Sequence, residues 1–199
     1  MSFSNVAASR GVALDVVLLS AVVALGAVAV AAWRGGSDAV GSSAAALAAP
    51  IYLGLPVGAL VTIRETAGPA VLFLLMLTIM ASDIAQYYTG RALGRRALAP
   101  RISPGKTVEG AIGGLVAAAL VMAAAGRWWL PSMPTALALI LGLVVGVLGI
   151  IGDLFESSLK RGAGLKDSSS LIPGHGGVLD RIDALLFAAP VYYIVLKYL

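Results

Sequence analysis

The chain contains no cysteine, which excludes disulfide bonds and metal sites built from thiolates. Charged residues are also scarce, at 12% of 199 residues, whereas a typical soluble domain has about 25%. The alternation of apolar and polar residues that predicts soluble β-strands is not evident. By contrast, 59% of the residues are hydrophobic, above the roughly 45–50% of soluble domains. The composition therefore predicts an all-α integral membrane protein.

Six apolar stretches come close to or exceed the length of about 20 residues that a membrane-spanning helix needs. The first, residues 11–33, is longer than the roughly 7–15-residue core of a signal peptide, which favours a retained span. We therefore expect a polytopic bundle of about six transmembrane helices, with polar loops on the cytoplasmic side. With no hydrophilic linker, residues 1–199 are predicted to form one transmembrane domain, divided into N-terminal spans (1–68) and a core (69–199). The expected spans are residues 11–33, 44–63, 69–88, 108–126, 135–154 and 184–199.

The distribution of lysine and arginine predicts the orientation of the chain. Five basic residues lie in the loop 91–106 and four more lie between 160 and 181. Two predicted spans separate these loops, so both lie on one side, whereas the turns on the other side hold only Arg64 and Arg127. Because basic loops are retained in the cytoplasm, the polar loops are predicted to be cytoplasmic and both termini to be outside.

Residues 153–183 hold half of the ten acidic residues and the only histidine. If the preceding helix continues, one of its faces carries Asp153, Glu156, Ser157 and Lys160, while Asp180 and Asp183 share a face of the next helix. Carboxylates at two helix ends suit a hard divalent cation such as Mg²⁺, whose other ligands are phosphate oxygens and water. Four basic residues nearby could bind a polyphosphate: Lys160, Arg161, Lys166 and Arg181. The alternative is a solvated loop with surface ion pairs.

The segment 173–177 is a glycine-rich bend whose backbone can approach a ligand closely. It carries His175, which could contact phosphate, donate a proton or bind metal, although a purely structural histidine fits equally well. Together with Gly176 and Gly177, this residue is a candidate for substrate binding.

A second candidate region lies between residues 83 and 109. Asp83 is a carboxylate inside an apolar run, which is costly in a membrane, and it is either functional or paired with Arg91 or Arg95. The turn 103–107 places Lys106 at a predicted helix start, where free amides bind anions. Its alternative is an ordinary basic loop in which Ser103 or Thr107 caps the helix.

At these residues the sequence resembles the phosphatidate cytidylyltransferases (CDP-diacylglycerol synthases). One family motif is matched along residues 157–183 and a second block along residues 83–110, where Gln86 replaces a residue that is often small. The matched positions of the first motif are Ser157, Leu159, Lys160, Arg161, Lys166, Asp167, Ser169, Ile172, Pro173, His175, Gly176, Gly177, Val178, Asp180, Arg181, Ile182 and Asp183. Those of the second are Asp83, Tyr87, Gly90, Arg91, Gly94, Arg95, Pro100, Ser103, Pro104, Lys106, Thr107, Glu109 and Gly110.

The resemblance implies a reaction in which CTP and phosphatidate give CDP-diacylglycerol and pyrophosphate, with residues 69–199 as the catalytic core. It implies that Asp153, Asp180 and Asp183 hold Mg²⁺, with room for a monovalent partner such as K⁺. It further implies a homodimer in a bacterial inner membrane, a site facing the cytoplasm and no nucleic-acid partner. The residues expected to act in catalysis or phosphate binding are Asp83, Lys160, Arg161, Lys166 and Arg181, and those expected to contact substrate are Ser103, Lys106, Thr107, Ser157, Asp167, His175, Gly176 and Gly177.

Three other functions are compatible with parts of this pattern. A sister enzyme would use CTP on another lipid phosphate, such as an unsaturated ether lipid, through the same chemistry. An ion-coupled transporter would carry acids near the bilayer midplane, whereas here Asp83, Asp153, Asp180 and Asp183 are all predicted at one side. A structural scaffold accounts for the apolar spans but not for the spacing of the polar residues.

Overall fold

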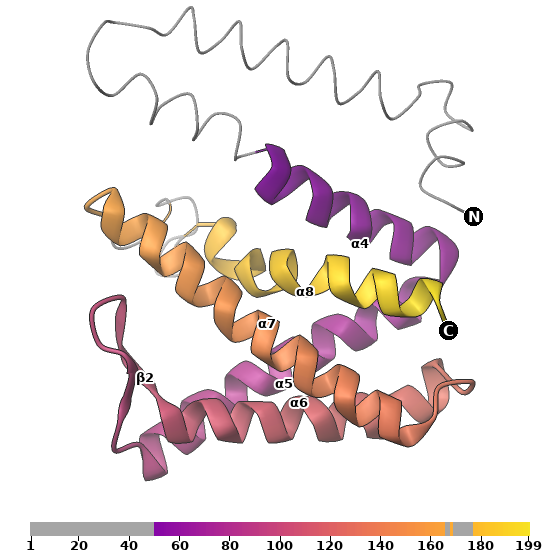
Figure 1. Cartoon of the computed structure of the whole chain (residues 1–199), viewed down its shortest axis with the longest axis horizontal. Coiled ribbons are helices and arrows are strands. Elements are labelled where there is room, and N and C mark those ends of the chain that lie inside the picture. The colour runs from indigo at the N-terminus through magenta and orange to yellow at the C-terminus, as the bar shows by residue number, and fades with distance from the viewer. Residues whose placement is uncertain (1–49, 166–167, 169–176) are drawn as a thin grey trace, which may run out of the picture. The chain divides into compact units, whose positions relative to one another are not determined.

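The computed structural model describes residues 50–165, 168 and 177–199, and divides the chain into two compact units, residues 1–58 and 59–199. The first expected span, residues 11–33, lies outside the described residues. In the described part, a π-helical turn is followed by five α-helices and one β-hairpin (Figure 1). The elements are η1 (Pro50–Gly54), α4 (Leu55–Thr66), α5 (Pro69–Leu93), β1 (Ala97–Ala99), β2 (Ser103–Thr107), α6 (Val108–Trp129), α7 (Thr135–Gly162) and α8 (Leu179–Lys197).

The turn between α4 and α5 follows directly from its sequence. Gly68 has φ 94°, a conformation that residues with a side chain rarely adopt. Pro69 then occupies the first turn of α5, where its missing N–H would have no helical partner in any case. The connection between these helices is shorter than the gap between the expected spans 44–63 and 69–88, because α4 continues to Thr66.

Glycines allow the long helices of the second unit to approach one another closely. A Cβ atom at Gly110 of α6 would lie 2.7 Å from the carbonyl oxygen of Gln86 on α5. At Gly142 of α7 it would lie 2.5 Å from the Ala118 carbonyl oxygen on α6. Small residues at such crossings let helices pack without a hydrophobic driving force, as membrane helices must. In Figure 1, α5 and α6 lie along each other while α7 crosses them and leads to α8.

Buried side chains from several helices complete the core. Tyr192 of α8 is fully buried, and its hydroxyl donates a hydrogen bond to the Val71 carbonyl of α5 at 3.2 Å. This satisfies the polar end of an aromatic side chain that is otherwise surrounded by apolar groups. Leu74, Met122 and Val145 are equally inaccessible and belong to the same cluster. The four long helices therefore share one core.

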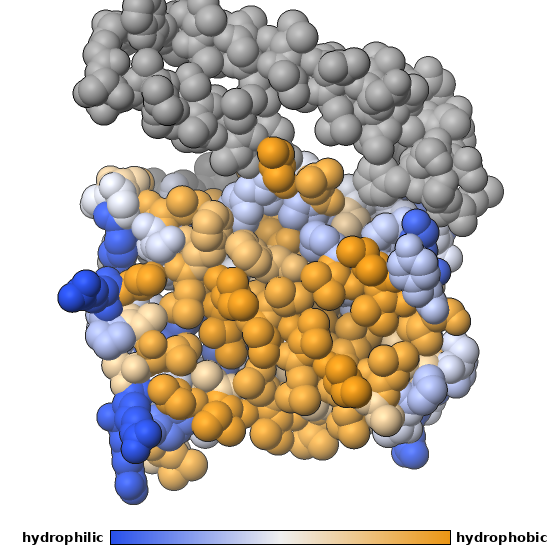
Figure 2. All heavy atoms as spheres, viewed as in Figure 1, coloured by the Kyte–Doolittle hydropathy of each residue, from blue (hydrophilic) through white to orange (hydrophobic). Residues whose placement is uncertain are grey.

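The outer surface of these helices is apolar. Ile84, Leu120 and Ile140 are each more than half exposed, and Figure 2 shows a broad hydrophobic surface with hydrophilic residues gathered at its two ends. Within the described residues, three helices are long and apolar enough to cross a membrane: α5, α6 and α7. Exposed apolar surface of this extent indicates a membrane protein. Helix α8 is not among the three, since Asp180, Arg181 and Asp183 occupy its first turns.

The β-hairpin departs from the all-α expectation. Strands β1 and β2 pair antiparallel, Ala97 with Thr107 and Ala99 with Ser103, in a segment that we expected to be an irregular basic loop. The physical reason lies in two prolines, because the residues that precede Pro100 and Pro104 are disfavoured in helical conformation and adopt extended ones. The rest of the described chain is mostly helical, as the composition predicts.

Helix α7 extends beyond the expected end of its span. It continues from the apolar stretch through to Gly162, eight residues past the predicted boundary at 154. Because the helix continues, Asp153, Ser157 and Lys160 lie on one face of α7, as the spacing predicts. Ser157 Oγ donates to Asp153 Oδ1 at 3.4 Å, as expected for residues one turn apart.

Candidate active site

A polar cavity of about 430 Å³ lies where α5, the hairpin, α6 and α7 meet. It brings Asp83 of α5 together with Lys106 and Thr107 of β2 and Asp153 of α7, so the two regions singled out in the sequence adjoin one another. Its lining residues are Asp83, Gln86, Tyr87, Gly90, Arg91, Gly105, Lys106, Thr107, Gly110, Ala111 and Asp153. We refer to it below as the polar cavity.

Lys106 and Asp153 form an ion pair inside the polar cavity. The lysine side chain is 22% exposed and the aspartate 37%, so both charges still reach solvent or a ligand. The pair joins the hairpin to the middle of the C-terminal half of α7, across 47 positions of sequence (153 minus 106). Lys106 is thereby held at the cavity wall, where an incoming anion would compete with Asp153 for its ammonium group.

Thr107 caps helix α6. Its hydroxyl oxygen accepts a hydrogen bond from the Gly110 amide at 3.1 Å, which satisfies one of the free N–H groups of the first turn. The side chain fits into a socket of three glycines, because a Cβ at Gly90, Gly94 or Gly110 would come within 3.0 Å of it. The capping role that we set beside phosphate binding is therefore present, and the residue also lines the cavity.

The hairpin is anchored at its base by Glu109. One carboxylate oxygen, Oε2, accepts hydrogen bonds from the backbone amides of Arg95 at 3.0 Å and Arg96 at 3.2 Å. The Val108 amide donates to the Arg96 carbonyl at 2.9 Å. These contacts tie the end of α5 to the start of α6, and so determine where β2 presents Lys106.

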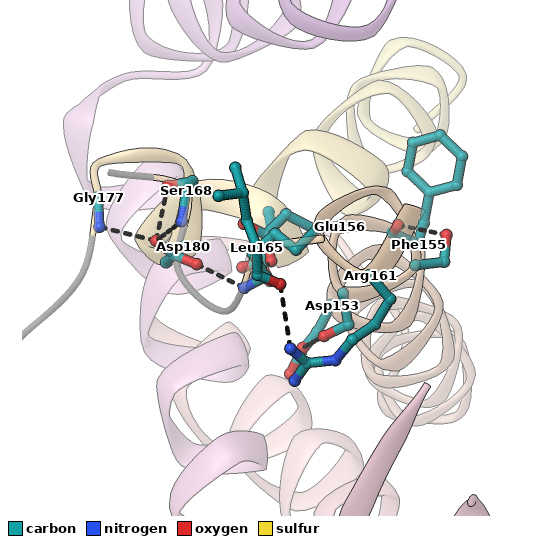
Figure 3. Close-up of polar contacts among 12 residues, drawn as sticks. Asp153, Phe155, Glu156, Arg161, Leu165, Ser168, Gly177 and Asp180 are labelled. Carbon is teal, nitrogen blue, oxygen red and sulfur yellow. Dashed lines mark hydrogen bonds and ion pairs between the residues drawn. The ribbon is translucent and has the colours of Figure 1, made fainter. Parts of the chain in front are cut away.

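A second group of charges joins the end of α7 to the start of α8. Lys160 Nζ lies 2.5 Å from Asp180 Oδ1 and also forms an ion pair with Glu156. The other oxygen, Asp180 Oδ2, accepts from the Gly177 amide at 2.7 Å and from the hydroxyl and amide of Ser168 at 2.6 and 3.1 Å. Figure 3 shows Ser168 and Gly177 against Asp180. We call Glu156, Lys160, Ser168, Gly177 and Asp180 the Lys160 cluster.

The Lys160 cluster keeps Asp180 ionised. Partial burial favours the neutral acid, but hydrogen bonds from Lys160, Ser168 and the Gly177 amide favour the carboxylate more strongly, and the pKa of Asp180 lies well below its usual range. Glu156 is only 1% exposed, so its charge depends on Lys160 for compensation. One ammonium group therefore serves two carboxyl groups, one from each helix.

Asp183 lies one turn after Asp180 in α8 and beside Gly152, the residue before Asp153 in α7. It is buried, and its Oδ1 accepts a hydrogen bond from the Ala184 amide at 2.8 Å. Gly152 makes this placement possible, because a Cβ there would lie 2.6 Å from the Asp183 carbonyl oxygen. Helices α7 and α8 therefore touch backbone to backbone beside the acids.

The predicted metal ligands can be compared with this arrangement. Within residues 50–165, 168 and 177–199, no three histidine, aspartate or glutamate side chains are grouped closely enough to hold one metal ion. Asp153 and Asp183 interact electrostatically, whereas Asp180 is engaged by Lys160. The donors nevertheless fit Mg²⁺, which binds through one or two carboxylates, substrate phosphates and water. The assignment of Asp153, Asp180 and Asp183 as ligands stays a prediction.

Other predicted residues are only partly brought together. Arg161 Nη1 donates to the Leu165 carbonyl at 3.1 Å, and Arg181 is exposed on the first turn of α8. Ser103 pairs with Ala99 in the hairpin and does not line the polar cavity. The expected contacts of Lys166, Asp167, His175 and Gly176 lie outside the described residues.

Several residues of the site were not among the predicted site residues. Gln86 lines the cavity and its amide Nε2 donates to Asp83 Oδ1 at 3.2 Å. Arg91 also lines the cavity, and the helical spacing of Asp83, Tyr87 and Arg91 was the signal that could have identified it. Glu156 belongs to the site because it forms an ion pair with Lys160, and Ser168 because its hydroxyl donates to Asp180. For Ser168 no sequence signal was available, because its contact depends on how α7 and α8 pack.

These features define a helical membrane protein with charged residues from α5, α7 and the hairpin gathered around one cavity. Comparison with known proteins then specifies the family. The model of the cytidylyltransferase family matches residues 3–199, and the chain belongs to this family.

Curated relatives are similar over about two thirds to three quarters of the chain. A phosphatidate cytidylyltransferase of Synechocystis is 48% identical over 143 residues, covering 70% of this chain and 44% of the relative. That of Bacillus subtilis is 42% identical over 152 residues, covering 74% and 56%. The uncharacterized protein YnbB of Escherichia coli is 48% identical over 128 residues, covering 64% and 42%. The chain thus spans about half the length of the curated relatives it matches.

Proposed function

We propose that this protein transfers CMP from CTP to phosphatidate, giving CDP-diacylglycerol and pyrophosphate. The observation that carries the proposal is the polar cavity, where the Lys106–Asp153 ion pair joins the two candidate regions of the sequence, 83–109 and 153–183, in a chain that the family model matches over residues 3–199. The names of the Synechocystis and Bacillus relatives support phosphatidate as the acceptor. The product would enter phospholipid synthesis.

The reaction forms one bond and breaks one. An oxygen of the phosphatidate phosphate attacks the α-phosphorus of CTP, and the bond from that phosphorus to the bridging oxygen of the β-phosphate breaks, so that pyrophosphate leaves with the electron pair. Such a transfer requires positioning and charge neutralisation rather than covalent help from the protein. Because both reactants are anions, cationic groups must offset their repulsion.

Lysines of the site are suited to this task. Lys106 at the cavity wall would bind a substrate phosphate by exchanging Asp153 for the anion. Lys160 would do the same at the end of α7, where Asp180 and Glu156 hold it in place. Further phosphate contacts are assigned to Arg161, Lys166 and Arg181, and substrate contacts to Ser103, Thr107, Ser157, Asp167, His175, Gly176 and Gly177.

We assign the divalent cation to Asp153, Asp180 and Asp183, with Asp83 as a supporting acid. Bound Mg²⁺ would neutralise charge on the phosphates during transfer. Asp153 and Asp183 already lie within electrostatic range of each other. Asp180 would have to exchange part of its contact with Lys160 and Ser168 to join them. A monovalent cation such as K⁺ is a second candidate for the same acidic region.

The site is proposed to face the cytoplasm of a bacterial inner membrane. CTP is a soluble cytosolic nucleotide and the lipid phosphate lies at the membrane surface, so a site near the helix ends meets both. The basic residues of the hairpin segment favour cytoplasmic retention of this end. A homodimer is part of the same proposal, with the apolar helix faces as the contact.

The decisive experiment measures formation of CDP-lipid from CTP by the purified full chain, with phosphatidate and with an unsaturated ether lipid phosphate as competing acceptors. Turnover with phosphatidate that requires Mg²⁺ supports the proposal. Preference for the ether lipid would favour the sister activity, which needs the same site but a different lipid groove. CTP-independent ion flux in vesicles, with no CDP-lipid formed, would point to a transporter instead.

A further inference from the structure

Three residues of α5 place an acid, a phenol and a guanidinium along one wall of the polar cavity. Asp83, Tyr87 and Arg91 are spaced four residues apart, which puts them on the same face of the helix. All three line the cavity. The same wall includes Gly90, whose lack of a side chain leaves room between α5 and Thr107. The C-terminal part of α5 is thus a functional surface as well as a structural one.

Arg91 differs from Lys106 and Lys160 in its electrostatic environment. Lys106 is paired with Asp153, and Lys160 with Glu156 and Asp180. Arg91, by contrast, forms its side-chain hydrogen bond with a neutral group, because its Nη1 donates to the Tyr87 hydroxyl at 3.1 Å. Among the residues that the structure describes, no carboxylate lies within ion-pair distance of it. Its positive charge is therefore not offset by a direct partner.

The contact with Tyr87 orients the guanidinium while leaving most of its donors available. An arginine has five N–H donors, and only one is engaged by the phenol oxygen. Tyr87 is itself held by an edge contact with Tyr88, with ring centroids 5.3 Å apart. The remaining donors form the planar fork that binds phosphate through two parallel hydrogen bonds.

We propose that Arg91, positioned by Tyr87, binds a phosphate group of the substrate in the polar cavity. This inference rests on the proposed function and adds a phosphate-binding residue to it. The phosphate belongs either to CTP or to the lipid acceptor, since both present the same chemistry. Lys106 and Arg91, which line the cavity together, would then contact anionic oxygens within one binding site.

The test compares steady-state kinetics of Arg91→Ala, Arg91→Lys, Tyr87→Phe and Arg95→Ala in the purified full chain. Arg95→Ala is the matched control. Arg95 lies four residues after Arg91 and carries the same charge, but its side chain does not line the cavity. The substitution also keeps the Arg95 backbone amide that donates to Glu109. CTP is titrated at saturating phosphatidate in one arm, and phosphatidate at saturating CTP in the other. The arm in which KM rises identifies the source of the phosphate.

We expect Arg91→Ala to raise one KM by about 10- to 100-fold, the loss expected for a charge-assisted hydrogen bond. Arg91→Lys should recover part of this loss, Tyr87→Phe should raise the same KM a few-fold, and Arg95→Ala should leave both within about twofold. Equal KM values for Arg91→Ala and Arg95→Ala, or a fall confined to kcat, would overturn the inference. If Arg91→Ala does not fold, Arg91→Lys decides by the same criterion. A wild-type protein without turnover would remove the proposed function as well, whereas an active wild type isolates the role of Arg91.

Discussion

The ammonium nitrogen of Lys160 lies 2.5 Å from Asp180 Oδ1, although the two residues are 20 positions apart. This contact joins the last turns of α7 to the first turn of α8. Glu156 binds the same ammonium from one turn earlier in α7 and is almost completely buried. A single lysine thus stabilises two carboxylates at the junction of two helices, and its removal would leave both without their counter-charge.

Replacing Lys160 should therefore destabilise the protein. In Lys160→Met the buried Glu156 and the nearby Asp180 would lose their shared cation, and breaking a buried ion pair in this way costs about 3–5 kcal/mol. Glu156→Gln is the control, because it leaves the Lys160–Asp180 pair intact and replaces the buried acid by a neutral group of similar size. Thermal unfolding in detergent should show a clear fall in Tm for Lys160→Met and little change for Glu156→Gln. Equal Tm values for Lys160→Met and the wild type would contradict the structural role of the cluster.

The close contact between α7 and α8 gives a second prediction. Alanine at Gly152 would place a Cβ 2.6 Å from the Asp183 carbonyl oxygen, so α8 would have to move away together with its acidic residues. We expect Gly152→Ala to lose most CTP-dependent turnover, at least tenfold. Gly162→Ala, in the same helix, meets nothing within 4 Å and should keep wild-type activity. Full activity of Gly152→Ala would mean that the helix spacing at this point does not control the site.

Lys106 is expected to act mainly in substrate binding. Lys106→Ala removes an ammonium group from the cavity wall and leaves Asp153 without its partner, so an anionic substrate meets a more negative cavity. The KM for CTP or for phosphatidate should rise by about 10-fold or more, as for other hydrogen bonds to charged groups. Lys197→Ala, at the end of α8 beside Tyr198, serves as the control for loss of one positive charge. If KM and kcat of Lys106→Ala equal those of the wild type, Lys106 has no role in substrate binding and the hairpin is an ordinary basic segment.

The acidic residues give a prediction for metal dependence. Asp183→Asn and Asp180→Asn should each abolish turnover while the protein still inserts into the membrane, because each removes a carboxylate assigned to Mg²⁺. Chelation with EDTA should stop the wild-type reaction, and added Mg²⁺ should restore it. Glu65→Gln, an acid that does not line the polar cavity, is the control for loss of one negative charge. Near-normal turnover of purified Asp183→Asn would remove that residue from the metal assignment.

The sequence predicted the helical character and indicated two candidate regions, for reasons that are local. Long apolar runs form helices because every backbone polar group must be bonded within the segment when lipid surrounds it. The spans at 69–88, 108–126 and 135–154 correspond to α5, α6 and α7, although all three helices continue past the predicted ends. Polar spacing then identified Asp83, Lys106 and Asp153 as candidates before their proximity was known.

The tertiary structure decided how the charges are partnered. Asp153 and Asp180 were predicted to act together, yet one is paired with Lys106 and the other with Lys160. That division depends on how α7 crosses α6 and meets α8, where glycines such as Gly152 permit backbone contact. The sequence by itself thus determined a helical membrane protein with acids and bases suited to phosphate chemistry. Only packing between distant segments decided which of those side chains meet, because ion pairs and hydrogen bonds depend on ångström-scale distances that spacing along one helix does not specify.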